Sequence, residues 1–231
     1  LSPDIVQVSM AVSKLGRMRN GWQPAVKLLQ SASERYGVAP NTITYNAAIS
    51  ACEKGRQWKR AVALLGEMEA AGVAPDTITY NTLISACSNG KQPELALELL
   101  REMEAAGLRP DRITYNTLIS ACGRGAQPER ALELLREMEG RGLAPDVITY
   151  NAAISACEKG GQWERALALL GEMEAAGVVR NTITYSAAIS ACEKGGQWER
   201  ALALLGEMEA AGVARDTSTH SAAIGARATA E

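Results

Sequence analysis

The chain has 231 residues, of which 47% are hydrophobic and 22% charged, and its formal net charge is −2. That balance is ordinary for a globular protein and lacks the overall basic charge that marks many nucleic-acid binders. The single histidine excludes metal sites built on several imidazoles and leaves one candidate for a histidine base. No apolar stretch is long enough to cross a bilayer, so we expect no membrane partner.

A period of 35 residues organises almost the whole sequence. The cysteines are each 35 residues apart, and one tyrosine per period keeps the same spacing. Residues 158–178 recur without change as 193–213. A fixed period of about 20 to 50 residues is typical of a repeat array rather than of one globular core, so we predict a solenoid. The repeated positions are Cys52, Cys87, Cys122, Cys157 and Cys192, with Tyr45, Tyr80, Tyr115, Tyr150 and Tyr185.

The repeat units can be placed in chain order from this period. The first unit, residues 5–41, is irregular, with one extra residue near Gly21 and another between residues 31 and 36. Residues 217–231 supply only the first half of a last unit. Because the sequence starts at a leucine and stops within a unit, we expect residues 1–231 to be a fragment of a longer array. The full units between them are 42–76, 77–111, 112–146, 147–181 and 182–216.

Each unit is predicted to be a pair of helices. In unit 77–111, apolar residues recur at helical spacing over 78–87 and again over 95–103, on either side of Asn89 and Gly90. Gly107 is a typical residue for the end of the second helix. One such hairpin cannot bury its apolar stripe alone and must stack on its neighbours. The sequence therefore predicts an all-α solenoid of stacked helix-turn-helix repeats.

The cysteines are predicted to be small apolar core residues. Equivalent positions of stacked helices lie roughly 8–10 Å apart, whereas a disulfide needs Cα atoms within about 7 Å. No two cysteines are close enough in sequence to form a zinc-binding pair. We therefore expect neither disulfides nor a metal site, and we expect no cofactor.

The repeat closely resembles the pentatricopeptide repeat family. The resemblance rests on Ile-Thr-Tyr-Asn-Thr-Leu-Ile-Ser-Ala-Cys at 78–87, on Ala-Leu-Glu-Leu-Leu at 96–100, and on Gly-Leu-Arg-Pro-Asp at 107–111. The tetratricopeptide type, with its 34-residue period, fits less well. The uniform 35-residue length resembles the pure class of the family rather than the class with repeats of alternating length. The resemblance covers residues 5–231 and implies a right-handed superhelix.

The resemblance also implies a function, the sequence-selective binding of single-stranded RNA. Repeats of this kind read one base each through two or three side chains. The family usually acts in mitochondria or plastids, in RNA processing, stabilisation or translation, which makes other RNA-processing proteins possible further partners. No small-molecule substrate is implied.

Two residues per unit are implied to choose the base: the residue after the tyrosine and the last residue of the unit. An apolar residue two places before the tyrosine is implied to wedge between bases. The target that the resemblance implies is 5′-A-U-U-U-(C/U)-G-3′, and the last half-unit is expected to read nothing, because Ser221 has no closing partner. The base-reading pairs are Ser9 with Asn41, Asn46 with Asp76, Asn81 with Asp111, Asn116 with Asp146, Asn151 with Asn181, and Ser186 with Asp216. The wedging residues are Val6, Ile43, Ile78, Ile113, Ile148 and Ile183.

The same residues admit a purely structural interpretation. The last residue of each unit lies where a helix N-cap belongs, and aspartate and asparagine are good N-caps. Asparagine and serine early in a helix can bond to its first turn without any ligand. From spacing alone, the wedging residues would be core. Capping does not explain a polar residue directly after the tyrosine, in a segment that is otherwise apolar.

A row of cations late in the first helices provides candidate phosphate contacts. Because the two helices of each hairpin face different sides, this row can coexist with a negative net charge and with the acids of the second helices. The row consists of Lys54, Arg124, Lys159 and Lys194, with Asn89 as its gap.

Two other classes of function compete with RNA binding. A protein-interaction scaffold is one, since solenoid grooves commonly hold peptides, but a peptide groove does not require asparagine or serine after each tyrosine. An enzyme is the other, but catalysis needs an asymmetric set of groups, and nearly every titratable group here is repeated. His220 is the exception, and we interpret it as a degraded tyrosine position. We therefore expect no catalytic residues.

Overall fold

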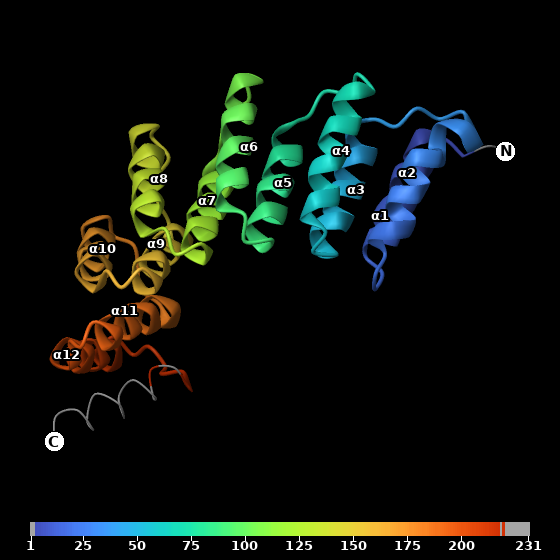
Figure 1. The fold of residues 1–231 in the computed structure, drawn as a ribbon. Helices are drawn as coiled ribbons and strands as arrows, with labels where there is room; N and C mark the ends of the chain where they lie inside the picture. Colours follow the sequence, from blue (N-terminus) through green and yellow to red (C-terminus); the bar gives the residue numbers. More distant parts are fainter. Residues whose placement is uncertain (1–2, 218, 220–231) are drawn as a thin grey trace. The chain divides into compact units, whose positions relative to one another are not determined.

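The computed structural model describes residues 3–217 and residue 219, and every helix in that part of the chain is α-helical, without β-strands (Figure 1). The expectation of an all-α solenoid is confirmed. The chain divides into two compact units, residues 1–117 and 118–231, and the division falls inside one helix. Each unit is a stack of helical hairpins.

The first unit contains three hairpins and the start of a fourth. Within it, each first helix packs on the first helix of the next hairpin, so that first helices form one layer and second helices the other. The helices are α1 (Ile5–Gly16), α2 (Trp22–Tyr36), α3 (Thr42–Lys54), α4 (Trp58–Ala70), α5 (Thr77–Asn89), α6 (Pro93–Ala105) and the first part of α7 (Arg112–Arg124).

The second unit continues the same pattern. After the rest of α7 it contains α8 (Pro128–Gly140), α9 (Val147–Lys159), α10 (Trp163–Ala175), α11 (Thr182–Lys194) and α12 (Trp198–Ala210). None of the helices described is both long and apolar enough to cross a bilayer.

The two extra residues of the first hairpin are the net result of longer and shorter segments: α1 has 12 residues where α3 has 13, and residues 37–41 follow α2 where residues 71–76 follow α4. Its second helix, α2, has 15 residues where α4 has 13. Its turn runs over residues 17–21, whereas residues 55–57 make the corresponding turn between α3 and α4. The irregular repeat therefore keeps the hairpin but has a longer turn at one end.

The two helices of a hairpin begin and end by different means. First helices begin with a capping box: the Asp76 side chain accepts the Thr79 N–H at 2.8 Å, and Thr79 Oγ1 accepts the Asp76 N–H at 3.0 Å. Second helices end at a glycine, as the sequence predicts. Gly107 has φ +74°, and the Leu108 N–H reaches back to the Met103 carbonyl at 3.1 Å. This is a Schellman motif, which satisfies carbonyls that the helix leaves unpaired.

The cysteines are free thiols, and the prediction that they are core residues is confirmed. All five are completely buried. Burial raises the pKa of Cys52 to about 11 and that of Cys87 to about 12. These thiols are therefore neutral near physiological pH and act as small apolar side chains.

Neighbouring hairpins approach closely where the turn of one meets the second helix of the other. A Cβ added to Gly55 would lie 2.6 Å from Trp22 Cδ1, and one added to Gly90 would overlap Trp58 in the same way. Gly90 has φ −79°, a value that any residue can adopt. Glycine is therefore required here for space.

We predict opposite effects of alanine at two glycines of the first unit. Gly90→Ala drives a methyl group into Trp58 and is expected to cost about 1–3 kcal/mol of stability, as overpacking does. Gly66→Ala lies inside α4 with no neighbour within 4 Å and is expected to stabilise by about 0.5–1 kcal/mol. Denaturant unfolding followed by circular dichroism measures both, and equal effects would contradict the close approach.

Candidate functional site

The predicted wedging residues lie on the surface. Val6, Ile43, Ile78, Ile113, Ile148 and Ile183 are 61%, 67%, 62%, 63%, 61% and 62% exposed. Each is the second residue of a first helix, and each of the isoleucines is followed by a threonine and a tyrosine that are buried. Spacing alone places these side chains in the core, and that interpretation is wrong. The structure instead leaves a regular row of apolar side chains in solvent.

Beside this row, the two predicted base-reading residues of one repeat contact each other. Asn46 Nδ2 donates to Asp76 Oδ1 at 3.0 Å, although 30 residues separate them. Thr79, from the next repeat, completes the group. Its hydroxyl lies 2.6 Å from Asn46 Oδ1 and 2.9 Å from Asp76 Oδ1, so one proton serves two acceptors. Thr79 is fully buried, so that water cannot replace these bonds.

The hydrogen bonds keep Asp76 ionised. Burial by itself raises the pKa of Asp76, but the hydrogen bonds from the Thr79 N–H, the Asn46 amide and the Thr79 hydroxyl outweigh it, and the pKa is lowered from its ordinary value. At neutral pH the carboxylate can therefore only accept hydrogen bonds. This fixes the orientation of the Asn46 amide, which must turn its nitrogen towards Asp76.

Two further repeats repeat this arrangement. Asn81 Nδ2 donates to Asp111 Oδ1 at 3.3 Å, and the Thr114 hydroxyl donates to Asn81 Oδ1 at 2.6 Å. In the second unit, Asn151 Nδ2 donates to Asn181 Oδ1 at 3.2 Å. There the Thr184 hydroxyl donates to Asn151 Oδ1 at 2.6 Å. Asn116 and Asp146 belong to different units: Asn116 follows Tyr115 in α7, and Asp146 caps α9.

The two serine pairs differ from the asparagine pairs. The Ser186 hydroxyl donates directly to Asp216 Oδ2 at 2.9 Å. Ser9 is only 8% exposed and does not bond to Asn41. Its hydroxyl lies 2.8 Å from both the Ile5 carbonyl and Thr44 Oγ1, and Thr44 in turn donates to Asn41 Oδ1 at 2.9 Å. The first pair is therefore joined only through the threonine.

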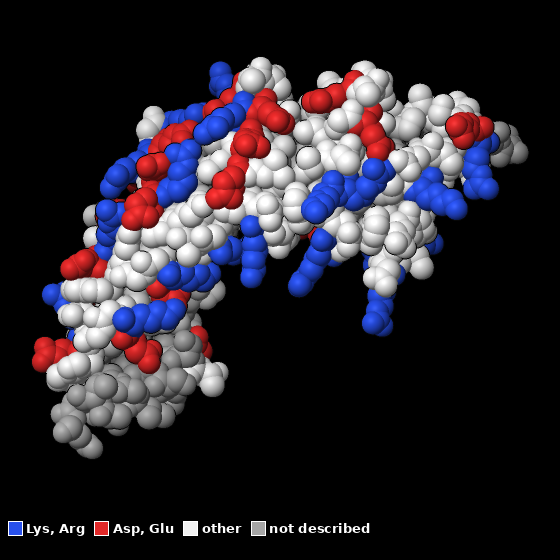
Figure 2. Space-filling view, viewed as in Figure 1, with Lys and Arg blue, Asp and Glu red and all other residues white. Residues whose placement is uncertain are grey.

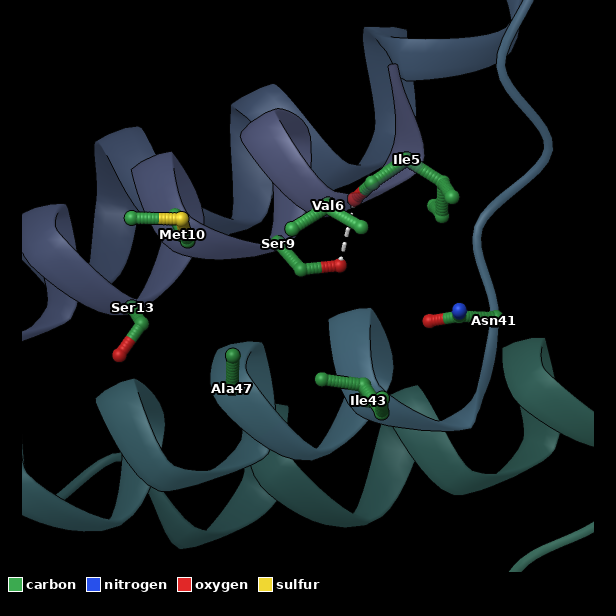
Figure 3. Close-up of a pocket in the computed structure, with 8 residues that line it drawn as sticks. All are labelled: Ile5, Val6, Ser9, Met10, Ser13, Asn41, Ile43 and Ala47. Carbon is green, nitrogen blue, oxygen red and sulfur yellow. Dashed lines mark hydrogen bonds between the residues drawn. The ribbon is translucent and has the colours of Figure 1, made fainter.

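An apolar cavity lies beside that first pair. It measures about 320 Å³ and lies between α1 and α3, flanked by Val6 and Ile43. Figure 3 shows the side chain of Asn41 pointing towards it and the Ser9 hydroxyl held at its wall. The cavity thus combines two apolar flanks with a polar group at one end.

The pairs differ in the hydrogen-bonding groups that they can offer to a ligand. Within the described residues, Asp76 Oδ2 accepts no hydrogen bond, and Asn46 Nδ2 retains a second hydrogen. That pair offers one donor and one acceptor. The amide nitrogen of Asn181 has no acceptor in the described chain, so Asn151 and Asn181 offer two donors. The Ser186 hydroxyl donates its proton to Asp216 Oδ2, so both side chains can act towards a ligand only as acceptors.

The predicted phosphate residues all lie at the exposed last turn of a first helix, but they do not share one environment. Lys194 Nζ forms an ion pair with Glu158 Oε1 at 2.7 Å, and the Glu158 side chain is only 15% exposed. The Ser190 hydroxyl also donates to that oxygen, at 2.9 Å. In the described part of the chain, Lys54 and Lys159 form no hydrogen bond or ion pair through their side chains. Glu158 therefore neutralises one member of the row.

Charge is separated along the hairpins as well as between their helices. Over α1–α6, basic side chains project mainly from the edge where each first helix turns into the second, and acids gather where the second helices end (Figures 1 and 2). The acids include Glu67, Glu69, Glu102 and Glu104. A net negative chain can thus present a basic edge.

Sequence reasoning missed the threonines before each tyrosine and the part played by Glu158. The threonines recur every 35 residues, which was the available signal, but their partners lie 33 residues away. The described residues contain no group of three histidine, cysteine or acidic side chains that could hold a metal ion. His220, Ser218 and Ser221 lie outside the described residues.

Similarity to solved structures points to one family of RNA-associated proteins. The chain is 32% identical to the maize pentatricopeptide repeat protein PPR10, with a TM-score of 0.70, over 95% of this chain and 31% of that one. PPR10 in complex with an 18-nucleotide psaJ RNA element matches at 30% identity and a TM-score of 0.59, over 96% of this chain and 36% of that one. This chain thus spans about a third of the length of PPR10.

A more distant structure shares the fold. The PPR domain of protein-only RNase P 1 from Arabidopsis thaliana, in complex with tRNA, is 18% identical with a TM-score of 0.65, over 75% of this chain and 91% of that one. Among curated protein sequences, none is significantly similar to the chain.

Family models identify the repeats directly. The pentatricopeptide repeat domain model matches residues 63–125 and 98–160, and the PPR repeat family model matches residues 145–194. The PPR repeat model matches residues 43–73 and 183–213. Together these matches run without a break from residue 43 to residue 213, well over half of the chain, and the chain belongs to the pentatricopeptide repeat family.

Proposed function

We propose that the chain binds single-stranded RNA sequence-selectively, one base per repeat, with 5′-A-U-U-U-(C/U)-G-3′ as its preferred sequence. The observation that carries the proposal is the change in hydrogen-bonding groups from one reading pair to the next. Residues 1–231 form one array in this proposal, with the unit boundaries that the period predicts. That PPR10 has been solved with an RNA element supports the choice of ligand.

An asparagine–aspartate pair suits uracil. Uracil presents an N3–H donor beside a carbonyl acceptor on its Watson–Crick edge, the edge that proteins read in unpaired RNA. The outward oxygen of Asp76 can accept the N3–H while the second Asn46 hydrogen is donated to the carbonyl. The pair at Asn81 and Asp111 has the same groups, and we assign the same to Asn116 and Asp146.

The other two pairs suit different bases. Asn151 and Asn181 offer two donors, which complement the N3 and O2 acceptors of cytosine. Ser186 and Asp216 offer two acceptors, which complement the N1–H and N2–H donors of guanine. In the first repeat, the amide nitrogen of Asn41 has no acceptor among the described residues and can donate to N1 of adenine. The exposed isoleucines then lie where bases can stack against them.

The biological action would be occupancy of a transcript. A bound array can block nucleases, remodel RNA structure or guide processing, and it needs no catalytic group of its own. A mitochondrial or plastid location and contacts with other RNA-processing proteins belong to the same proposal and rest on family membership. Because six bases recur often in any transcript pool, selection of a single transcript requires more repeats than these.

The first test is a change of one reading group. Asn181→Asp keeps the size of the side chain and its capping oxygen but turns the donor–donor pair into a donor–acceptor pair. We expect wild type to prefer AUUUCG over AUUUGC and over the matching DNA, and Asn181→Asp to prefer AUUUUG over AUUUCG by about tenfold. Fluorescence anisotropy at two salt concentrations measures this.

Two outcomes would contradict the proposal. If wild type binds all three nucleic acids equally at low salt, the chain does not discriminate between bases. Absence of RNA binding altogether would leave the protein-interaction scaffold as the leading function.

The buried threonine should matter for base choice as well as for stability. Thr79→Val removes the hydroxyl that orients Asn46, and we expect the preference for uracil over cytosine at the second base to fall about tenfold. Thr79→Ser should retain it. Thr82→Val is the matched control, because the Thr82 hydroxyl donates only to the Ile78 carbonyl of its own helix. If stability falls but discrimination does not, Thr79 supports the fold alone.

Release of Lys194 should strengthen binding. Glu158→Gln removes the charge that pairs with Lys194, and we expect tighter RNA binding with a salt slope steeper by about 0.7, the value of one added phosphate contact. Glu193→Gln changes the net charge equally, and the Glu193 side chain forms no hydrogen bond or ion pair in the described residues. Equal slopes for the two variants would show that only net charge matters.

A further inference from the structure

Four cations surround one cavity at the turn end of the first two repeats. The cavity measures about 400 Å³ and lies between the turn 17–21 and the last turn of α3. We call it the turn pocket and define it by Arg17, Arg19, Lys54, Arg56 and Trp22. No acidic residue is among the residues that line it.

None of these four charged groups has a partner in the described part of the chain. Other cations of this protein are paired: Arg60 lies 2.7 Å from Glu67, and Arg180 lies 2.8 Å from Glu174. Arg17, Arg19, Lys54 and Arg56 are all exposed and form no side-chain hydrogen bond or ion pair within residues 3–217 and 219. Gathering like charges costs energy by mutual repulsion, and a bound anion would relieve that cost.

The backbone at the pocket also favours an anion. Helix α2 begins there at Trp22, and no side chain caps its first turn. The N-terminus of a helix carries partial positive charge and unpaired N–H groups. The added length of the first turn brings Arg17 and Arg19 to this place, where the regular repeats have a shorter turn.

The concentration of charge is peculiar to these two repeats. Residues 17–21 carry two cations and residues 54–56 carry two more. The later turns 89–91, 124–126, 159–161 and 194–196 carry one each. Lys54 is also a member of the row for which phosphate contacts are proposed, so the pocket continues that row.

We propose that the turn pocket is a phosphate-binding site that anchors an RNA strand at the first two repeats. This inference rests on the proposed RNA binding for the source of its phosphate. Four cations exceed what one internal phosphodiester, with a single charge, requires. A terminal phosphate carries a charge of about −1.5 to −2 and offers three acceptor oxygens, so both a strand end and an internal phosphate are sources to be distinguished.

The test compares two double variants of equal charge. Arg17→Gln/Arg19→Gln removes two cations of the pocket, whereas Lys27→Gln/Arg35→Gln removes two exposed cations of α2 that do not line it. With AUUUCG RNA, we expect the first variant to weaken binding and to flatten the salt slope by about 1.4, two phosphate contacts. We expect the second to leave the slope within about 0.3 of wild type. Equal slopes for the two variants would overturn the proposal.

Three RNAs distinguish a terminal phosphate from an internal one. They are AUUUCG with a 5′-phosphate, AUUUCG with a 5′-hydroxyl, and AUUUCG extended by three nucleotides at its 5′ end. If the pocket holds a strand end, the difference between wild type and Arg17→Gln/Arg19→Gln is largest with the 5′-phosphate. If it holds an internal phosphate, the extended strand shows that difference instead. The same loss with every strand places the pocket on a phosphate within the hexamer.

A second probe tests phosphate binding in the turn pocket independently of base reading. Pyrophosphate titrated into the full chain and followed by phosphorus NMR should bind to wild type and to Lys27→Gln/Arg35→Gln, but not to Arg17→Gln/Arg19→Gln. If no RNA binds but pyrophosphate does so in this pattern, the pocket stands and the proposed function fails. If RNA binds while pyrophosphate binding is the same in all three proteins, the pocket fails and the proposed function stands.

Discussion

The fully buried threonine hydroxyl between neighbouring repeats is the contact on which the rest of the array depends. Thr79 accepts the N–H of Asp76, which starts α5, and it also contacts the amide of Asn46 in α3. Because the hydroxyl is shielded from water, its partners must be correctly placed for the repeats to stack without an unsatisfied polar group. Helix capping, repeat stacking and the orientation of an asparagine that is proposed to read a base are therefore one requirement.

Hydrogen bonds within each pair determine which polar groups remain for a ligand. A carboxylate that accepts several hydrogen bonds on one oxygen remains charged and presents its other oxygen to a ligand. An asparagine whose carbonyl oxygen and one amide hydrogen are already hydrogen-bonded presents only its remaining N–H. The number of groups that face a ligand is thus small and fixed, and a change of one atom, as between Asp76 and Asn181, changes what the pair can accept.

Most of the fold could be predicted because its causes are local or periodic. The 35-residue period, the capping residues before each first helix and the glycine after each second helix lie within one repeat and can be read from it. The exposure of Ile78 could not be derived from spacing, because an apolar residue beside buried Thr79 and Tyr80 fits a core pattern equally well. The resemblance to a known family, rather than periodicity, indicated its outward position.

The contacts that sequence reasoning missed all join different repeats. Thr79 meets Asn46 across 33 residues, and Lys194 meets Glu158 across 36. Neither sequence separation equals the 35-residue period, because each separation depends on how one hairpin is shifted against the next. The turn pocket could not be predicted for a related reason: its cations come from two successive turns, which have different lengths.

Because the proposed reading pairs at Asn46, Asn81 and Asn151 are each completed by a threonine of the following repeat, the module proposed to read a base is displaced by a few residues from the module that is duplicated in the sequence. The same threonine stands at positions 44, 79, 114, 149 and 184, whereas the reading residues vary. Each of these repeats therefore presents a threonine hydroxyl at the same position to the repeat before it. If each repeat reads one base, as proposed, unequal recombination between identical stretches such as 158–178 and 193–213 lengthens or shortens the recognised sequence by one base.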